Sequence, residues 1–292
     1  MFDIYAAVTD RIISELEKGI IPWRKPWIGG ADVAVSHDSG KPYSLLNQMM
    51  LGNPGEYITW TQIQKEGGKV KKGAKARMVV FWKLLPRDKQ DSNGQTVLDA
   101  DGNPVKEMLP VLKYFNVFHI DDCEGIKPKF APEELPAVHA DPVEEAEKVF
   151  SDYRARTGVK FEQANQGRAY YRPSDDLISL PLMEQFPDTA EYYSTLFHEA
   201  THSTGHASRL NRFAAGAGAA AFGSDDYSKE ELVAEIGAAA ILNQLGMETT
   251  GSFANSAAYI QSWLRALKED KRLIVGAASR AEKAAALIMG TI

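Results

Sequence analysis

The segment YYSTLFHEATHSTGH, residues 192–206, carries three of the six histidines of the protein. His198 and His202 are four residues apart, and side chains at that spacing project from one face of a helix, so that both imidazoles reach a single ion. The apolar residues before His198, and Gly205 after the motif, are typical of a packed helix that ends at a glycine. We predict a helix over 188–204 with two metal ligands. The alternative is a solvated helix face on which two histidines occur by chance.

Glu199 lies about 100° around this helix from His198, which places its carboxylate beside the open position of the metal and not on the metal. From there it would take a proton from a metal-bound water and pass it to a leaving amine. The pattern therefore predicts a metal-dependent peptidase site with Glu199 as its catalytic base. A nuclease is less favoured, because phosphodiester hydrolysis usually employs carboxylate-rich sites with magnesium or manganese.

A tetrahedral site with an open position needs a third protein ligand. His206 follows the helix-ending Gly205 too closely to swing back readily, so we expect it beside the ligands or facing the substrate, with ligation as the less favoured alternative. The downstream segment KEELVAEIGAAA offers Glu231 and Glu235, four residues apart on a predicted helix. This resembles the gluzincin arrangement, in which Glu231 would bind the metal and Glu235 would orient a ligand histidine through its second ring nitrogen. The opposite assignment, with Glu235 as the ligand, stays open.

The predicted site takes one divalent metal ion. We expect Zn²⁺, although two histidines and a glutamate also accept Mn²⁺ or Co²⁺. Tyr227, just ahead of the second helix, is a further catalytic candidate, because its hydroxyl would donate a hydrogen bond to an oxyanion.

The composition, with 44% hydrophobic and 25% charged residues, is that of a core-forming protein. No apolar run approaches the roughly 18 residues of a membrane span, and the N-terminus lacks the apolar core of a signal peptide. The single cysteine, Cys123, excludes an internal disulfide and has no evident partner that would make it a nucleophile. These features predict a cytoplasmic protein without a membrane partner.

The net charge of −6 conceals an asymmetry between the two halves. Residues 1–130 have 18 Lys and Arg against 16 Asp and Glu, whereas residues 131–292 have 15 against 23. Within the first half, residues 60–89 hold nine basic side chains and two acidic ones. This segment is therefore suited to attract a polyanion even though the whole protein is acidic.

Tryptophans are interspersed with these basic residues. Two flank the basic pair of PWRKPW, residues 22–27, and two more lie within residues 60–82. Bases of single-stranded nucleic acid stack on aromatic rings with about 1–3 kcal/mol each, and Lys and Arg hold the phosphates. We predict single-stranded DNA as a partner, bound by Trp23, Arg24, Lys25, Trp27, Trp60, Lys69, Lys71, Lys72, Lys75 and Arg77. Core packing is the alternative for each tryptophan, and we expect Trp82 to be buried.

Hydrophobic periodicity and turn signals give the order of the elements. The two prolines of IIPWRKPW, residues 20–27, predict an extended path. In the first half we expect helices over 3–18, 45–51 and 61–66, and strands over 77–84 and 111–120 around an exposed hairpin or insertion at 86–110. In the second half we expect helices over 143–157, 188–204, 228–245, 254–269 and 276–289, with short strands over 160–163, 169–172 and 177–180.

Prolines recur between residues 127 and 142, where the charge balance changes sign, and this is typical of an extended linker. We therefore predict an α+β protein of two domains. An N-terminal α/β domain over 1–128 would bind single-stranded DNA. A linker over 129–142 would lead to a mainly helical domain with a small sheet over 143–292.

Several motifs, in order, make the chain resemble the ArdC-type antirestriction proteins. The N-terminal segments include DIYAAVTDRIISELEKGIIPWRKPW, YITWTQIQKEGGKVKKGAKARMVVFWK and YFNVFHIDDCEG. The C-terminal segments include YYSTLFHEATHSTGHASRLNR and YSKEELVAEIGAAAILNQLG. The departures are small: residues 86–110 look like a variable insertion, and AAGAGAAAFG, residues 214–223, is unusually rich in Ala and Gly.

The resemblance implies a protein of conjugative plasmids that protects incoming DNA from host restriction, with a single-stranded-DNA-binding domain and a zincin-like metallopeptidase domain of the gluzincin type. It places His198, Glu199 and His202 on HExxH, and Glu231 on the glutamate of the second helix. The expected partners are single-stranded DNA and an unidentified protein substrate or host restriction component. The alternative is a non-catalytic protein that coats DNA or blocks the restriction enzyme and keeps a structural metal.

Overall fold

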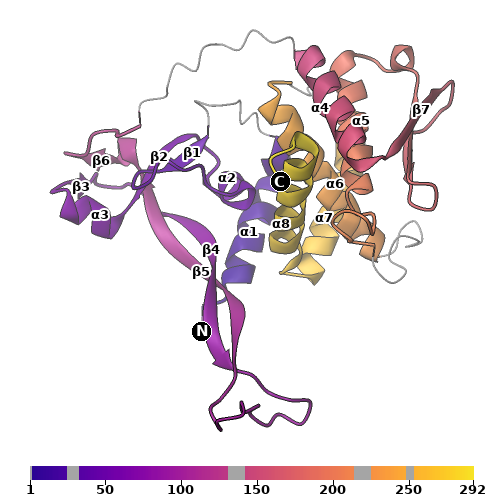
Figure 1. Ribbon diagram of the computed structural model, residues 1–292. Helices are drawn as coiled ribbons and strands as arrows, with labels where there is room; N and C mark the ends of the chain where they lie inside the picture. The colour runs from indigo at the N-terminus through magenta and orange to yellow at the C-terminus, as the bar shows by residue number, and fades with distance from the viewer. Residues whose placement is uncertain (1, 25–32, 131–141, 214–224, 248–252) are drawn as a thin grey trace. The chain divides into compact units, whose positions relative to one another are not determined.

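The computed structural model describes residues 2–24, 33–130, 142–213, 225–247 and 253–292 (Figure 1). It combines helices and strands, so the predicted α+β class is confirmed. Two compact units make up the chain. The hairpin unit comprises Met1–Ile4 and Ile58–Ile126, and the helical unit comprises Tyr5–Tyr57 and Lys127–Ile292. Across the described ranges, no helix has the length and apolar character that crossing a bilayer requires.

The helical unit begins within α1 (Ile4–Leu16), whose apolar side chains recur every four residues. Val8, Ile12 and Leu16 are at most 1% exposed. The chain leaves the helix at Gly19, whose φ of 76° favours glycine. Three short elements follow, η1 (Pro22–Arg24), β1 (Ala34–Ser36) and α2 (Leu45–Leu51), and β1 pairs in parallel with β2 (Gly55–Thr59).

These N-terminal elements pack within the same unit as the C-terminal half. The Thr9 hydroxyl donates to the Lys271 carbonyl at 2.7 Å, and the Trp23 ring lies edge-on to Trp263 with centroids 5.1 Å apart. Packing thus groups residues 5–57 with the C-terminal half, whereas the predicted domains were 1–128 and 143–292. The predicted linker lies largely outside the described residues.

The C-terminal half continues with α4 (Pro142–Thr157) and a small sheet. Its strands are β7 (Lys160–Ala164), β8 (Tyr170–Arg172) and β9 (Leu177–Pro181), in the order β7-β9-β8. β9 lies in the middle, parallel to β7 and antiparallel to β8. A single turn, η3 (Met183–Gln185), leads on to the helices that carry the histidine motif.

Four helices complete this unit: α5 (Thr189–Ser203), α6 (Asp225–Gln244), α7 (Phe253–Glu269) and α8 (Leu273–Met289). The core includes Tyr193 and Phe197 of α5, Ile241 of α6 and Ile288 of α8, all at most 1% exposed. α5 and α6 approach closely at Gly237, where an added Cβ would lie 2.7 Å from the Thr201 side chain. That close approach brings the polar face of α6 against the histidines of α5.

The hairpin unit is built on a long antiparallel pair, β4 (Arg77–Asp88) and β5 (Lys106–His119), joined by residues 89–105 (Figure 1). Beside it lie α3 (Trp60–Lys65), η2 (Ile120–Asp122) and the pair β3 (Lys69–Val70) with β6 (Cys123–Glu124). α3 begins with a capping box between Thr59 and Gln62. The small core of this unit contains Ile58, Ile63 and Cys123, and burial raises the pKa of the Cys123 thiol, which disfavours a nucleophilic thiolate.

Three expectations about local structure are wrong. Residues 22–24 form a 3₁₀ turn and not an extended path. The paired strands reach Asp88 and restart at Lys106, so the predicted insertion at 86–110 shrinks to 89–105. Trp82 is 49% exposed and not buried, because its hairpin leaves much of that face uncovered.

Candidate metal centre

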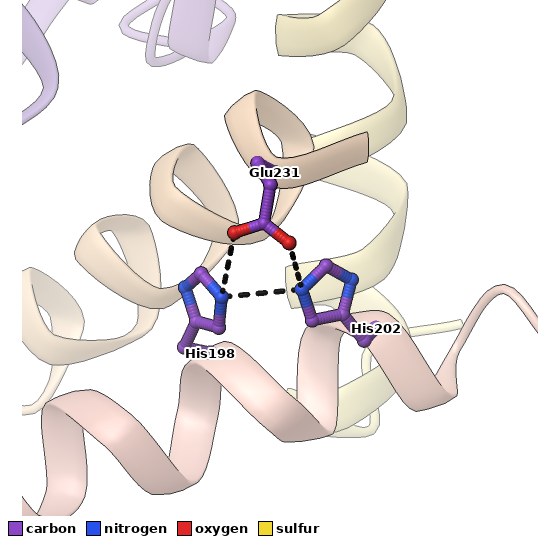
Figure 2. Close-up of side chains that lie close together, drawn as sticks. All are labelled: His198, His202 and Glu231. Atoms are coloured by element: carbon purple, nitrogen blue, oxygen red, sulfur yellow. Dashed lines mark hydrogen bonds and ion pairs between the residues drawn. The ribbon is translucent and has the colours of Figure 1, made fainter. Parts of the chain in front are cut away.

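The two histidines of the HExxH motif meet a glutamate of α6 (Figure 2). The Nε2 atoms of His198 and His202 lie 3.1 Å apart. Glu231 offers one carboxylate oxygen to each, at 3.4 Å from His198 Nε2 and 3.2 Å from His202 Nε2. The three residues are partly buried, and one ligand atom from each lies within 4.8 Å of the others. Two imidazoles and one carboxylate at these separations can hold one divalent cation.

The local sequence explains this convergence. Asp188 caps the N-terminus of α5, since its carboxylate accepts the backbone N–H of Glu191 at 2.8 Å, and the helix runs unbroken through both histidines. Their spacing of four residues places the imidazoles on one face, with ring centroids 4.8 Å apart. The close approach at Gly237 holds α6 against that face.

The second ring nitrogen of each histidine also faces a carboxylate. His198 Nδ1 lies 3.6 Å from Glu235 Oε1, and His202 Nδ1 lies 3.5 Å from Glu230 Oε1. The contact of Glu235 is the one expected from the sequence, whereas Glu230 was not anticipated. Its signal was available in retrospect, because two ligand histidines need two orienting groups and the segment KEELVAE contains three glutamates.

Each of these outer carboxylates is bound by an arginine. Arg212 donates to both oxygens of Glu230, from Nε at 3.1 Å and from Nη2 at 2.6 Å. Arg24, from η1, donates from Nη2 to Glu235 Oε2 at 3.1 Å. Sequence reasoning assigned neither arginine to the metal centre, because the sequence does not show which carboxylate an arginine 18 or 211 residues away will meet.

The opposite charges of the histidines and glutamates shift the pKa values of His198, His202 and Glu231. Burial alone would lower the pKa of His202, but hydrogen bonds to Glu230 and Glu231 outweigh it and raise that pKa to about 10. Burial would also lower the pKa of His198, but the hydrogen bond to Glu231, together with the other nearby carboxylates, outweighs burial, so this pKa is raised. Burial would raise the pKa of Glu231, but the two histidines hold it far below its usual range. A divalent ion held by these three residues would compete with protons for the imidazole nitrogens.

The other candidates from the C-terminal half are placed less directly. Glu199 is buried, at 9% exposure, on α5 beside His198. His206 lies past the end of α5, where its Nδ1 contacts the Ser208 hydroxyl at 2.8 Å, and it is not part of the three-residue cluster. Tyr227 belongs to the first turn of α6, and its side chain lies outside the described residues.

The predicted DNA-binding residues divide into two groups. Trp23 is 1% exposed against Trp263, so its assignment as a stacking platform is wrong: the ring is core. The guanidinium of Arg24 is bound to Glu235. Lys25 and Trp27 lie outside the described residues.

The second group lies in the hairpin unit. Trp60, at the start of α3, is 53% exposed, and its ring is tilted 6.3 Å from Phe118. The exposed lysines follow in and after β3, namely Lys69, Lys71, Lys72 and Lys75, and Arg77 at the start of β4 is half-buried. Sequence reasoning missed two further exposed aromatic residues of β5, Tyr114 and Phe115, at 40% and 54%. Their signal was the run of β-forming residues in VLKYFNVFHI, which cannot tell an open face from a covered one.

Two family models match the chain. The N-terminal domain of anti-restriction factor ArdC matches residues 2–118, and a zincin-like metallopeptidase matches residues 144–280. The antirestriction ArdC protein from plasmid R388, in its metal-free crystal structure, shares 37% sequence identity with this chain. The match covers 98% of this chain and 97% of the ArdC chain, with a TM-score of 0.71. The chain belongs to the ArdC antirestriction family.

Further proteins are similar to nearly the whole chain. The Mn(II)-bound structure of the R388 ArdC protein is 36% identical, with a TM-score of 0.72 over 99% of this chain and 98% of its own. An uncharacterised protein, y4eC, from Sinorhizobium fredii (strain NBRC 101917 / NGR234) is 33% identical over 97% of this chain and 90% of its own length. Two DNA primases TraC from Escherichia coli are 36% and 35% identical, but the chain spans only 19% and 26% of their lengths.

Proposed function

We propose that this ArdC-family chain is a metal-dependent peptidase that also binds single-stranded DNA, and that it protects incoming DNA of a mobile element from restriction in the cytoplasm. The observation that carries the peptidase part is the position of the Glu231 carboxylate between the Nε2 atoms of His198 and His202. These three residues would hold one divalent ion, with zinc as the expected metal. The relative solved with Mn(II) supports a divalent cation at this kind of site.

The chain's own residues supply the remaining chemistry. A bound divalent ion would act as a Lewis acid and lower the pKa of a water molecule. Glu199, buried beside His198, takes the water proton and delivers it to the nitrogen of the leaving amine. Tyr227 would donate a hydrogen bond to the oxyanion, and His206 would lie beside the ligands or face the substrate. Glu230 and Glu235 orient the two imidazoles through their Nδ1 atoms.

The number of protein ligands favours catalysis over a purely structural metal. Structural zinc sites are usually closed by four protein ligands, whereas catalytic sites keep three and leave a position for water. In the described ranges, three residues with suitable ligand atoms cluster here. The non-catalytic alternative, in which a structural metal accompanies DNA coating, therefore has less support.

The DNA-binding part rests on the hairpin unit. The exposed Trp60 offers a ring for base stacking, and the basic side chains between residues 69 and 77 offer contacts for phosphates. Single-stranded DNA is the proposed nucleic-acid partner, because a duplex hides the faces of its bases. The proposed protein partner is a substrate or a component of the host restriction system.

The test compares the parent protein with Glu199→Gln. Metal content is measured by mass spectrometry, and cleavage of labelled casein and of a purified restriction endonuclease is followed with and without a single-stranded oligonucleotide. We expect about one equivalent of metal in both proteins and cleavage reduced by about 10²–10⁴-fold in Glu199→Gln. Equal cleavage by both, or none by the parent, would refute the peptidase. If Glu199→Gln protects DNA as well as the parent, antirestriction does not require proteolysis.

A further inference from the structure

Two series of polar interactions support the candidate metal ligands, one behind each histidine. Behind His202 the order is Nδ1, then Glu230, then Arg212. Behind His198 the order is Nδ1, then Glu235, then Arg24. Both glutamates belong to α6, one before and one after Glu231. Each of them contacts the Nδ1 atom of one of the two histidines.

The two arginines differ in how they are held. Arg212 is 8% exposed, grips both oxygens of Glu230, and also donates to the Thr204 hydroxyl at 2.6 Å and to the Thr201 carbonyl at 2.8 Å. It comes from the segment just after the histidine helix and is 18 residues from Glu230. Arg24 is 22% exposed, donates to one oxygen of Glu235, and is 211 residues away from it in the chain.

Arg24 is nevertheless held in place by its neighbours. The preceding residue, Trp23, is 1% exposed and packs edge-on against Trp263, which is 3% exposed. A buried tryptophan fixes the path of η1, because any shift would open a cavity in the core. The guanidinium is therefore presented to Glu235 by a fixed segment of backbone.

Glu235 needs such a partner. It lies one turn after Glu231, and both carboxylates contact the same imidazole, one at each nitrogen. An unrestrained glutamate at this position would have two other choices: to turn towards solvent and release His198, or to compete with Glu231 for the metal. The positive charge of Arg24 holds Glu235 on the Nδ1 side.

We propose that Arg24 is a positioning residue of the metal centre, which acts through Glu235 to fix the orientation of His198. The inference rests on the proposed metal site and extends it, because it makes a residue of the N-terminal segment part of the peptidase machinery. It also reassigns Arg24 from DNA binding to the support of a metal ligand. The C-terminal half alone would then lack a component of its own site.

The test is a double-mutant cycle on the whole 292-residue chain, in which the d–d absorption of bound Co²⁺ reports binding. The variants are Arg24→Met, Glu235→Gln and the double variant. We expect Arg24→Met to weaken Co²⁺ binding by about 10–100-fold and to change the absorption spectrum. In the Glu235→Gln background the same substitution should change the Kd by less than about twofold, because its route to His198 is already removed.

Two controls separate positioning from folding. Arg24→Lys keeps the charge and should retain tighter Co²⁺ binding than Arg24→Met. Lys268→Met removes an exposed cation of the same unit, which pairs with Glu17, and should leave the Kd unchanged. Arg24→Gln is measured in parallel, so that failure of one variant to fold does not decide the result, and thermal unfolding monitors all variants.

Parent-like affinity in both Arg24→Met and Arg24→Gln would overturn the inference, as would a loss of affinity that persists in full in the Glu235→Gln background. These outcomes leave the proposed peptidase intact. Conversely, a parent that binds Co²⁺ but cleaves nothing would refute the peptidase while the role of Arg24 stands.

Discussion

Residues 5–24 and residues 60–89 both combine tryptophan with basic side chains, yet the two segments belong to different compact units. In the first, Trp23 is buried against Trp263 and Arg24 binds a carboxylate beside the candidate metal ligands. In the second, Trp60 is 53% exposed and its neighbouring lysines face solvent. The same residue types therefore enter a core or stay exposed according to what packs over them.

The largest expected difference between the two segments is in the free energy of unfolding after Trp23 or Trp60 is replaced by alanine. Trp23→Ala removes a fully buried ring and should lower the free energy of unfolding by about 3–5 kcal/mol. Trp60→Ala removes an exposed ring and should change it by no more than about 0.5 kcal/mol. Urea unfolding followed by circular dichroism measures both. Equal decreases would remove the distinction between the segments.

Trp60→Ala should lower the affinity for single-stranded DNA. Removal of one stacking platform should weaken binding of a fluorescent oligothymidylate by about 1–3 kcal/mol, which is roughly 5–150-fold. Trp60→Phe keeps an aromatic face and should retain most of the affinity. Fluorescence anisotropy provides the Kd values. An unchanged Kd in Trp60→Ala would exclude this ring from the DNA surface.

The smallest expected effect concerns the salt dependence of DNA binding. Lys69→Gln combined with Lys72→Gln should reduce the slope of log K against log salt by about 0.7 for each phosphate that the variant no longer neutralises. A cation of the helical unit, Lys268, serves as the matched control, and its replacement by Gln should leave the slope unchanged. Anisotropy titrations between low and moderate salt measure the slopes. If Lys268→Gln lowers the slope as much as the lysine pair does, the basic segment has no special role.

Much of the fold and of the site was accessible from the sequence, because it depends on local spacing. The four-residue intervals between His198 and His202, and between Glu231 and Glu235, fix which side chains share a helix face. The small residues of α6 allow a close helix pair, and Gly237 meets Thr201 at that contact. The gluzincin pattern added which glutamate faces which nitrogen.

The parts that escaped prediction depend on contacts between distant residues. The sequence around Trp23 does not show that the ring will pack against Trp263. The sequence around Arg24 does not show that its guanidinium will bind Glu235. The short strands β1 and β2 carry too few residues for a periodicity of two to be recognised. The contact of Glu230 was missed because Glu231, the next residue, points about 100° away from it around the helix. Only the packed helices show that both carboxylates reach histidines.

The measurement that tests the metal centre most directly is anomalous X-ray diffraction at the zinc absorption edge, from crystals of the protein grown with zinc. We predict one strong peak about 2.0–2.2 Å from the Nε2 atoms of His198 and His202 and from a carboxylate oxygen of Glu231. A peak elsewhere, or none, with the Glu231 side chain turned away from both imidazoles, would contradict the account.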